Sequence, residues 1–226
     1  MADSAELPGQ SAQPEGAQPG APETTGKVLV VGLGNPGIEY QFTPHNAGFL
    51  AIDRIADDYG VQVVNRRCRA VTATIRMAGR QVVLAKPETY MNLSGISVEA
   101  LVSEFEVDPE RDLVVMYDEL ALPLGTLRIR TGGSSGGHNG ANSINGALRI
   151  QEWARIRIGV GPQPGELNGR RGKDYLLTPM RKADLAELDP VLDKAARAVE
   201  MIVSQDIKAA MNEFNRREQN GPAEEE

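Results

Sequence analysis

A short apolar run followed at once by a glycine-rich loop most restricts the folds open to this chain. Residues 27–31 form an apolar, β-branched run typical of a buried strand, and the sequence from Gly32 to Gly37 comes directly after it. Further along, strand-like runs alternate with segments of helical periodicity. This alternation predicts an α/β sheet with helices on both faces.

The other elements follow from periodicity and from turn and capping residues. A helix is expected over 47–59 and another where Val98, Leu101, Val102 and Phe105 follow helical spacing. The runs 69–77 and 81–85 flank Gly79-Arg80 as a hairpin, which makes the sheet mixed rather than purely parallel. We also expect strands at 113–117, 126–130 and 156–160, a short helix at 142–150, and helices opening at Thr178-Pro179, Asp189-Pro190 and Asp206.

The length and composition favour one domain. A chain of 226 residues with 41% hydrophobic residues can bury a core, which is mostly aliphatic because aromatic residues make up only 4%. Residues 1–26 are rich in Pro, Gly, Gln, Ala and Ser and are predicted to be disordered, as is the acidic segment 217–226. The expected fold is a single α/β domain over 27–216, with a twisted mixed β-sheet and helices on both faces.

Several features indicate a cytoplasmic protein. No apolar run approaches the length of a membrane span, and the polar N-terminus is unlike a secretory signal. The single cysteine, Cys68, excludes an internal disulfide and fits a reducing compartment. Cys68 has arginines but no histidine nearby in sequence, which favours an inert thiol over a nucleophile.

The charge is unevenly distributed. The whole chain carries −7, but residues 1–26 contribute −4 and residues 221–226 contribute −3, so that 27–220 are neutral. Within that span, residues 123–182 carry a local net charge of +7. Such a segment can attract a polyanion whatever the total charge is, although a solvated surface balanced by distant acids is equally compatible.

The loop from Gly32 to Gly37 also satisfies the G-x-G-x-x-G pattern of dinucleotide-binding enzymes, which makes an oxidoreductase an alternative. Pro36 speaks against it because proline removes a backbone donor where a pyrophosphate would be bound. Pro44 and Gly48 interrupt the helix that should begin at the third glycine. The glycines can equally serve a tight turn after the strand.

Two histidines, His45 and His138, each lie in a glycine-rich loop and are each followed by asparagine. Histidine is suited to proton transfer near neutral pH, although either could be structural. Asp118 ends a predicted strand and could hold one imidazole tautomer, or could simply form a turn. Metal binding is not expected, because neither His-x-x-x-His nor Cys-x-x-Cys occurs.

Neutral amides accompany the histidines in separate polar loops, at Asn35, Asn92 and Asn139. The chain shows no nucleophile-elbow motif, and its loop from Gly132 to Gly137 lacks the ending of a phosphate-binding loop. This combination suggests hydrolysis by an activated water, with amides orienting an ester or amide substrate.

Taken in order, a set of short motifs resembles the bacterial peptidyl-tRNA hydrolases from Lys27 to about Phe214. Each motif is weak alone, but the ordered set is specific. The matching stretches are 31–37, Glu39-Tyr40, 45–48, Lys86-Pro87, 90–95, 118–120, Leu122-Pro123, 136–140 and 155–159.

The resemblance implies a monomeric enzyme without cofactor or metal that releases tRNA for translation by hydrolysing the ester between peptide and tRNA. His45 matches the general base that activates water, Asp118 the carboxylate that supports it, and Asn35 the residue that separates N-blocked from free aminoacyl ends. Positions matching contacts to the peptide, the terminal adenosine or the acceptor stem are Tyr40, Tyr90, Met91, Asn92, His138, Asn139, Arg128, Arg130 and Arg157.

Two departures from the family pattern bear on the loops rather than on the chemistry. Pro44 stands before the histidine where many relatives have a basic residue, and Ser134-Ser135 replace an extra histidine of some relatives. A second function remains open, because some relatives of this fold bind RNA without catalysis. The retained His45, Asp118 and Asn35 favour an enzyme.

Overall fold

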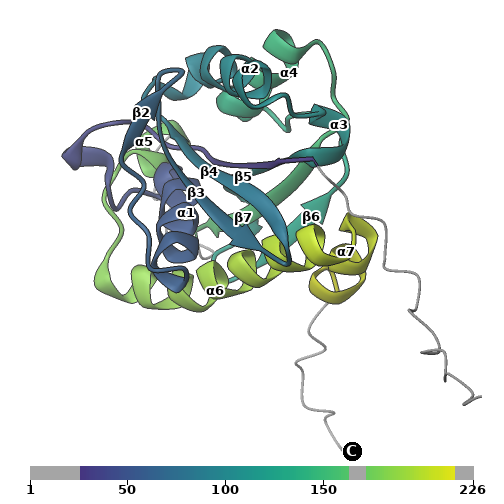
Figure 1. Ribbon diagram of the computed structural model, residues 1–226. Coiled ribbons are helices and arrows are strands. Elements are labelled where there is room, and N and C mark those ends of the chain that lie inside the picture. Colours follow the sequence, from purple (N-terminus) through teal and green to yellow (C-terminus); the bar gives the residue numbers. More distant parts are fainter. Residues whose placement is uncertain (1–25, 163–171, 217–226) are drawn as a thin grey trace, which may run out of the picture.

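The computed structural model describes residues 26–162 and 172–216 and contains one seven-stranded mixed sheet (Figure 1). Its strands are β1 (Val28–Gly32), β2 (Asn65–Arg67), β3 (Ala70–Met77), β4 (Arg80–Pro87), β5 (Leu113–Pro123), β6 (Leu127–Arg130) and β7 (Ala154–Gly161). They lie in the order β2-β3-β4-β1-β5-β7-β6. β1 is parallel to β4 and β5, and β5 to β7, whereas the outer pairs β2–β3, β3–β4 and β6–β7 are antiparallel.

Helices cover both faces of this sheet (Figure 1). They are α1 (Ala47–Asp58), α2 (Ser94–Phe105), α3 (Pro109–Asp112), α4 (Asn139–Leu148), α5 (Gly172–Leu176), α6 (Lys182–Ser204) and α7 (Ile207–Phe214), with short 3-10 turns η1 (Ile38–Tyr40), η2 (Pro44–Asn46) and η3 (Met91–Leu93). α1, α6 and α7 pack on one face, and α2 and α4 on the other. Within the described ranges, no helix is long and apolar enough to cross a membrane.

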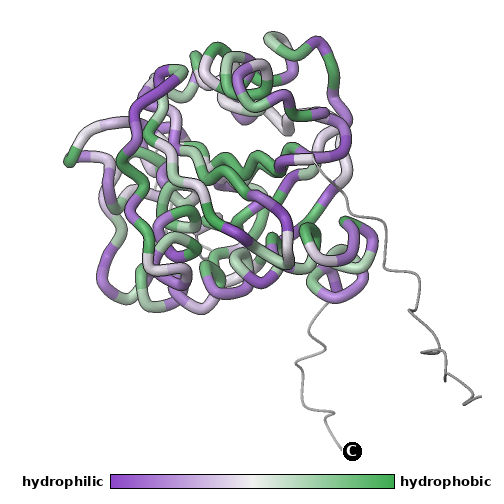
Figure 2. The backbone as a smooth tube through the Cα atoms, in the orientation of Figure 1, coloured by the Kyte–Doolittle hydropathy of each residue, from purple (hydrophilic) through white to green (hydrophobic). Residues whose placement is uncertain are grey.

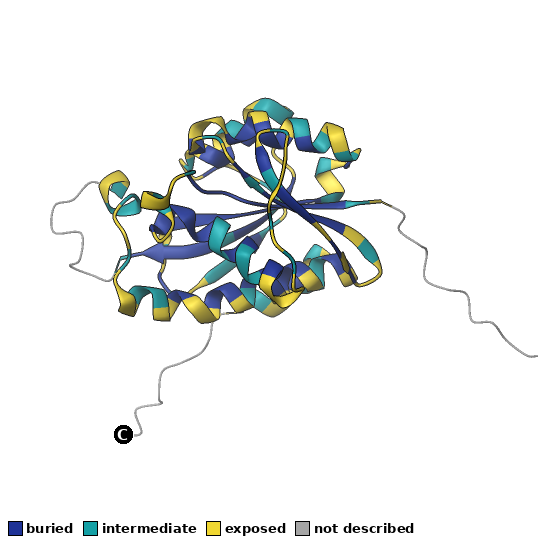
Figure 3. Ribbon diagram, turned by 60° about the vertical axis from the view of Figure 1, so that its left-hand side comes forward, coloured by how far each residue is buried: buried dark blue, intermediate teal, exposed yellow. Residues whose placement is uncertain are grey.

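Alternation along β1 explains why the central strand is apolar throughout. Val28 and Val30 join the core beneath α1 and α6, while Leu29 and Val31 join the core beneath α2 and α4. A strand covered on both faces needs apolar residues at every position. Figure 2 shows the central strands as hydrophobic, and Figure 3 shows the same strands buried while the outer sides of the helices are exposed.

The predicted fold class, a single α/β domain with a mixed sheet and helices on both faces, is confirmed. The predicted hairpin is β3–β4, whose turn uses positive φ angles at Ala78 (47°) and Gly79 (80°). Asp206 caps α7 as predicted, because its side chain accepts a 2.7 Å hydrogen bond from the Ala209 N–H. Of the tails predicted to be disordered, 1–26 and 217–226, all residues except Gly26 lie outside the described residues.

Two predicted helix starts near the C-terminus are wrong. Thr178 caps no helix, because α6 begins at Lys182 and the intervening Met180 N–H is bonded to the Phe42 carbonyl (2.9 Å). Pro190 lies inside α6 rather than at the start of a new helix. The buried apolar stripe of α6 continues on both sides of this proline, and its packing against the sheet offsets the backbone hydrogen bond that proline cannot donate.

Two glycines allow the loop after β1 to approach the sheet closely. A β-carbon at Gly48 would lie 2.4 Å from the Met116 carbonyl oxygen and 2.5 Å from the Leu33 nitrogen. A β-carbon at Gly32 would lie 2.1 Å from the Gly48 carbonyl oxygen. Any side chain at either position would push the first turn of α1 away from β5. Glycine is therefore needed there to bring the start of α1 against the centre of the sheet.

Candidate active site

The parallel strands place the predicted site residues at one edge of the sheet. Asn35 and His45 follow the carboxyl end of β1, and Met91 follows β4. Asp118 does not end its strand as predicted, because it lies within β5, which continues to Pro123, and is opposite Ile158 of β7. The carboxyl ends of parallel strands meet at the same edge, where open α/β sheets bind their ligands. The parallel strands thus bring together residues that are far apart in sequence.

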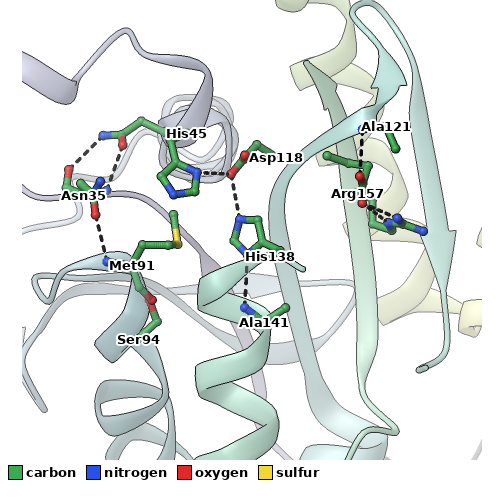
Figure 4. Close-up of polar contacts among 11 residues, drawn as sticks. Asn35, His45, Met91, Ser94, Asp118, Ala121, His138, Ala141 and Arg157 are labelled. Atoms are coloured by element: carbon green, nitrogen blue, oxygen red, sulfur yellow. Dashed lines mark hydrogen bonds and ion pairs between the residues drawn. The ribbon is translucent and has the colours of Figure 1, made fainter. Parts of the chain in front are cut away.

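His45 and Asp118 form a buried hydrogen-bonded pair across 73 residues of sequence (Figure 4). His45 Nδ1 lies 2.9 Å from Asp118 Oδ1, and the residues are 9% and 1% exposed. An ionised carboxylate can only accept, so Nδ1 carries the proton and donates it. In the neutral ring this leaves the lone pair on Nε2, which is the arrangement that a general base requires.

His138 binds the same carboxylate oxygen through its other nitrogen. Its Nδ1 caps α4 by accepting a hydrogen bond from the Ala141 N–H (3.2 Å), so in the neutral ring Nε2 carries the proton. That Nε2 donates to Asp118 Oδ1 at 2.9 Å, and the two imidazole centroids are 5.3 Å apart. Because His138 is the cap, α4 begins at Asn139 rather than at residue 142 as predicted.

The electrostatics of Asp118 are set by opposing effects. Burial by itself would raise the pKa of the carboxyl, but the charge and hydrogen bond of His138, together with those of His45, hold this pKa well below its usual range. Among the described residues, the second oxygen, Oδ2, is buried without a hydrogen-bond partner. Asp118 is therefore an ionised carboxylate whose contacts converge on a single oxygen.

This lowered pKa predicts how stability depends on pH. A group with a depressed folded-state pKa stabilises the protein above its unfolded pKa, which is about 3.9 for aspartate, and loses this effect as pH falls through the folded value. The unfolding free energy of wild type minus that of Asp118→Asn, measured by urea titration, should hold level from pH 5 to about pH 4 and shrink below it. A difference independent of pH would show that the folded-state pKa is not depressed.

Asn35 and Asn46 hold each other in the loop that carries His45. The Asn35 N–H donates to Asn46 Oδ1 (2.9 Å), and Asn46 Nδ2 donates to the Asn35 carbonyl (3.0 Å). Asn35 Oδ1 accepts from the Met91 N–H (2.9 Å), which ties the loop after β1 to the loop after β4 (Figure 4). The oxygen of the Asn35 side chain is thus occupied, and its Nδ2 has no protein partner among the described residues. The Asn35 amide is available as a donor.

Three potential metal ligands meet here, since donor atoms of His45, Asp118 and His138 lie within 4.8 Å of one another. A histidine that binds a metal normally donates its other N–H to an acceptor. His138 does the opposite, because its Nδ1 accepts from the Ala141 N–H and its proton is therefore on the Nε2 that faces Asp118. The tautomer of His138 therefore fits a hydrogen-bonded cluster with Asp118 and His45.

The remaining predicted contacts differ in their exposure. Met91 is buried (3%) beside the two histidines in Figure 4, whereas Tyr90 is 61% exposed at the start of η3. Asn92 and Asn139 are also exposed, and Tyr40 is half-buried in η1. These positions are consistent with a buried reactive centre surrounded by accessible polar and aromatic groups. Their contacts with substrate stay predictions.

The predicted basic residues lie on the paired strands β6 and β7. Arg128 is opposite Arg157 in the antiparallel register, and the pKa of Arg130 is lowered by burial and by the charges of Arg128 and Arg157. Arg157 is bound by Glu119, whose carboxylate accepts from its Nε (2.8 Å) and its Nη2. Like charges held this close favour an anion beside them. Arg157 is already partly neutralised, so Arg128 and Arg130 are the freer cations.

Asn46 and Glu119 are site residues that the sequence analysis did not single out. Asn46 directly follows His45. The asparagine that follows each histidine is the sequence signal that could have identified Asn46 as a site residue. Glu119 is only 6% exposed and accepts from the Ala121 N–H (3.0 Å) as well as from Arg157. Its adjacency to Asp118 was visible, but its ion pair depends on the pairing of β5 with β7, which sequence periodicity does not give.

Comparison with known protein families identifies the chain. Residues 29–222 match the family profile described as peptidyl-tRNA hydrolase. The chain belongs to the peptidyl-tRNA hydrolase family. The peptidyl-tRNA hydrolase of Acidobacterium capsulatum is 64% identical over 86% of this chain and 98% of its own length, and that of Koribacter versatilis is 55% identical over 84% and 92%.

Solved structures agree with this membership. A crystal structure of peptidyl-tRNA hydrolase from Acinetobacter baumannii superimposes with a TM-score of 0.75 at 35% identity, covering 83% of this chain and 94% of that one. A complex of a peptidyl-tRNA hydrolase with N-propanol gives a TM-score of 0.76 at 35% identity, with the same coverage. The dinucleotide-binding alternative also fails on geometry, because α1 begins only at Ala47 and not at the end of the glycine loop.

Proposed function

We propose that this protein hydrolyses the ester between peptide and tRNA, with His45 as the general base. The observation that carries the proposal is the state of His45, whose Nδ1 is held by Asp118 Oδ1 while Nε2 is left to accept a proton. Membership of the peptidyl-tRNA hydrolase family supplies the substrate class. The non-catalytic RNA-binding alternative gives no reason to keep a buried His–Asp pair beside an open amide donor.

In the proposed reaction, Nε2 of His45 takes a proton from a water molecule as its oxygen attacks the ester carbonyl carbon. The Asn35 amide donates a hydrogen bond to a carbonyl oxygen of the substrate and orients it. Collapse of the tetrahedral intermediate breaks the bond to the terminal ribose oxygen, which leaves with the proton held by His45. Asp118 stabilises the imidazolium in between, and free tRNA and a peptide acid are the products.

We further propose that the acceptor stem lies against Arg128 and Arg130 and that the terminal adenosine lies near Tyr90, Asn92 and Asn139. We also propose that the enzyme acts as a monomer and needs no metal, and the His138 tautomer supports the second of these points. The test is release of free tRNA from N-acetyl-aminoacyl-tRNA. A protein that bound this substrate without releasing tRNA would support the RNA-binding alternative instead.

Arg128→Ala and Arg130→Ala are expected to raise KM for full-length peptidyl-tRNA while leaving kcat nearly unchanged, because phosphate contacts position the substrate and do not react. Each lost contact should also flatten the log–log dependence of affinity on salt by about 0.7–0.9. The measurement is KM and tRNA affinity between 50 and 200 mM salt, a range of about fourfold in which such slopes are resolved.

Two controls make this test specific. Arg149→Ala removes a cation at the C-terminal end of α4, whereas His138 and the candidate site lie at its N-terminal end. This variant should leave the salt slope unchanged. A minimal ester of adenosine, which carries no acceptor stem, should be cleaved equally well by wild type and by the Arg128 and Arg130 variants. Equal losses on the minimal and the full-length substrate would contradict the acceptor-stem assignment.

A further inference from the structure

Arg155 of β7 is a buried cation whose hydrogen-bond acceptors in the described part of the chain are all neutral. The residue is 1% exposed, yet it forms no ion pair among the described residues. Its Nη1 donates to the Ser134 carbonyl (2.8 Å), and its Nη2 donates to the Gln151 carbonyl (2.9 Å) and to Asn145 Oδ1 (3.3 Å). The guanidinium carbon lies 4.0 Å from the ring centroid of Trp153. Burying a charge against neutral acceptors costs desolvation free energy, which indicates that these contacts serve a purpose beyond stability.

The three acceptors share one property, which is that they all belong to the segment that presents His138. Ser134 precedes the histidine in the glycine-rich loop, Asn145 lies in α4, and Gln151 follows the helix. The Gly133 N–H also donates to the Gln151 carbonyl (3.3 Å), which closes the segment onto itself. Arg155 therefore bonds to the segment before, within and after α4. Arg155 also contacts the Tyr117 side chain of β5, whose ring packs beside the His138 ring.

The loop ahead of His138 is held from within by hydrogen bonds to Ser135, whose carbonyl accepts from the His138 N–H (3.0 Å) and whose hydroxyl accepts from the Gly137 N–H (3.3 Å). Gly133, Gly136 and Gly137 have positive φ angles of 106°, 60° and 85° and no side chains with which to pack. At its end, His138 must place Nε2 on Asp118 Oδ1. A second line of contact joins the same groups, since the Tyr117 ring lies 4.7 Å from the His138 ring and 6.4 Å from the Trp153 ring on which Arg155 stacks.

We propose that Arg155 is a positioning residue for the reaction, which fixes the loop 132–137 and the start of α4 so that His138 meets the catalytic carboxylate. The inference rests on the proposed function and extends it to a residue that touches neither substrate nor reacting atoms. An arginine suits this role because its planar fork donates in several fixed directions at once, whereas lysine offers a single flexible ammonium. Within 26–162 and 172–216 its Nε is buried without a hydrogen-bond partner, so the arrangement favours the Nη contacts over full satisfaction of the side chain.

The test compares Arg155→Lys with a control of purely structural effect. Val199→Ala truncates a fully buried side chain of α6 in the core on the opposite face of the sheet. For each protein we would measure kcat and KM on N-acetyl-aminoacyl-tRNA, the melting temperature, and the NMR signal of the His138 Nε2–H. Arg155→Lys should lower kcat by about 10- to 100-fold, as expected for a shift of about 1 Å in a positioned group. It should also shift or broaden the His138 signal.

Val199→Ala should lower the melting temperature and leave both kcat and the His138 signal in place. If Arg155→Lys keeps wild-type kcat and an unchanged His138 signal, or if Val199→Ala causes the same losses, the positioning role is refuted. Should Arg155→Lys fail to fold, Asn145→Ala removes one acceptor on α4 and must then move the His138 signal. The NMR readout needs no substrate, so failure of wild type to release tRNA would overturn the proposed function while the signal still decides the role of Arg155.

Discussion

Replacing His45 with alanine is expected to leave a folded protein that still binds peptidyl-tRNA but turns it over about 10²–10⁴-fold more slowly. Nε2 of His45 is the ring nitrogen left to accept the water proton, because Nδ1 of His45 and Nε2 of His138 are donors to Asp118 and Nδ1 of His138 already accepts from the Ala141 N–H. Removing His45 therefore removes the acceptor of the water proton. The measurement is single-turnover release of tRNA, with binding checked separately on the same substrate.

His138→Ala is the matched control for this prediction, because it removes the other imidazole from Asp118 and keeps the base. Its loss of kcat should be clearly smaller than that of His45→Ala, since His45 Nδ1 retains its 2.9 Å contact with Asp118 Oδ1. If His45→Ala keeps more than about a tenth of the wild-type rate, its ring is not the base. If His138→Ala is the more damaging change, the roles of the two histidines must be exchanged.

Much of the fold could be predicted because local sequence patterns indicate its strands and helices. β1 reads as a fully buried strand, and the β3–β4 hairpin is marked by its turn at Gly79. The errors occur where tertiary packing overrides a local signal. Pro190 is a helix-start residue by composition, but the apolar stripe on both sides of it keeps α6 continuous from Lys182 to Ser204.

The residues of the candidate site could be predicted from the sequence, but the hydrogen bonds that join them could not. His45, Asp118 and Asn35 were visible as residues in polar loops or at a strand end, and the order of motifs pointed to their roles. No sequence pattern states that His45 and His138 share one oxygen of Asp118, because this depends on β1 lying next to β5 and on α4 starting at that edge. Arg155 was equally hidden, since a buried arginine with neutral partners looks like any other basic residue in a strand.

Asp118→Asn is expected to lower kcat by about 10²-fold, near the lower end of what general-base catalysis contributes and less than His45→Ala. The amide oxygen can still accept from His45 Nδ1–H and hold the ring in place. It cannot offset the positive charge that develops when Nε2 takes the proton from water. The variant should thus keep the geometry of the pair and lose its electrostatic support.

Glu119→Gln is the matched control for Asp118→Asn, because it also replaces a buried carboxylate with its amide. The carboxylate of Glu119 binds Arg157 rather than an imidazole, so this variant should keep kcat on a minimal ester of adenosine near the wild-type value. An equal loss of kcat in Asp118→Asn and in Glu119→Gln would mean that the contact between Asp118 and His45 does not support the base.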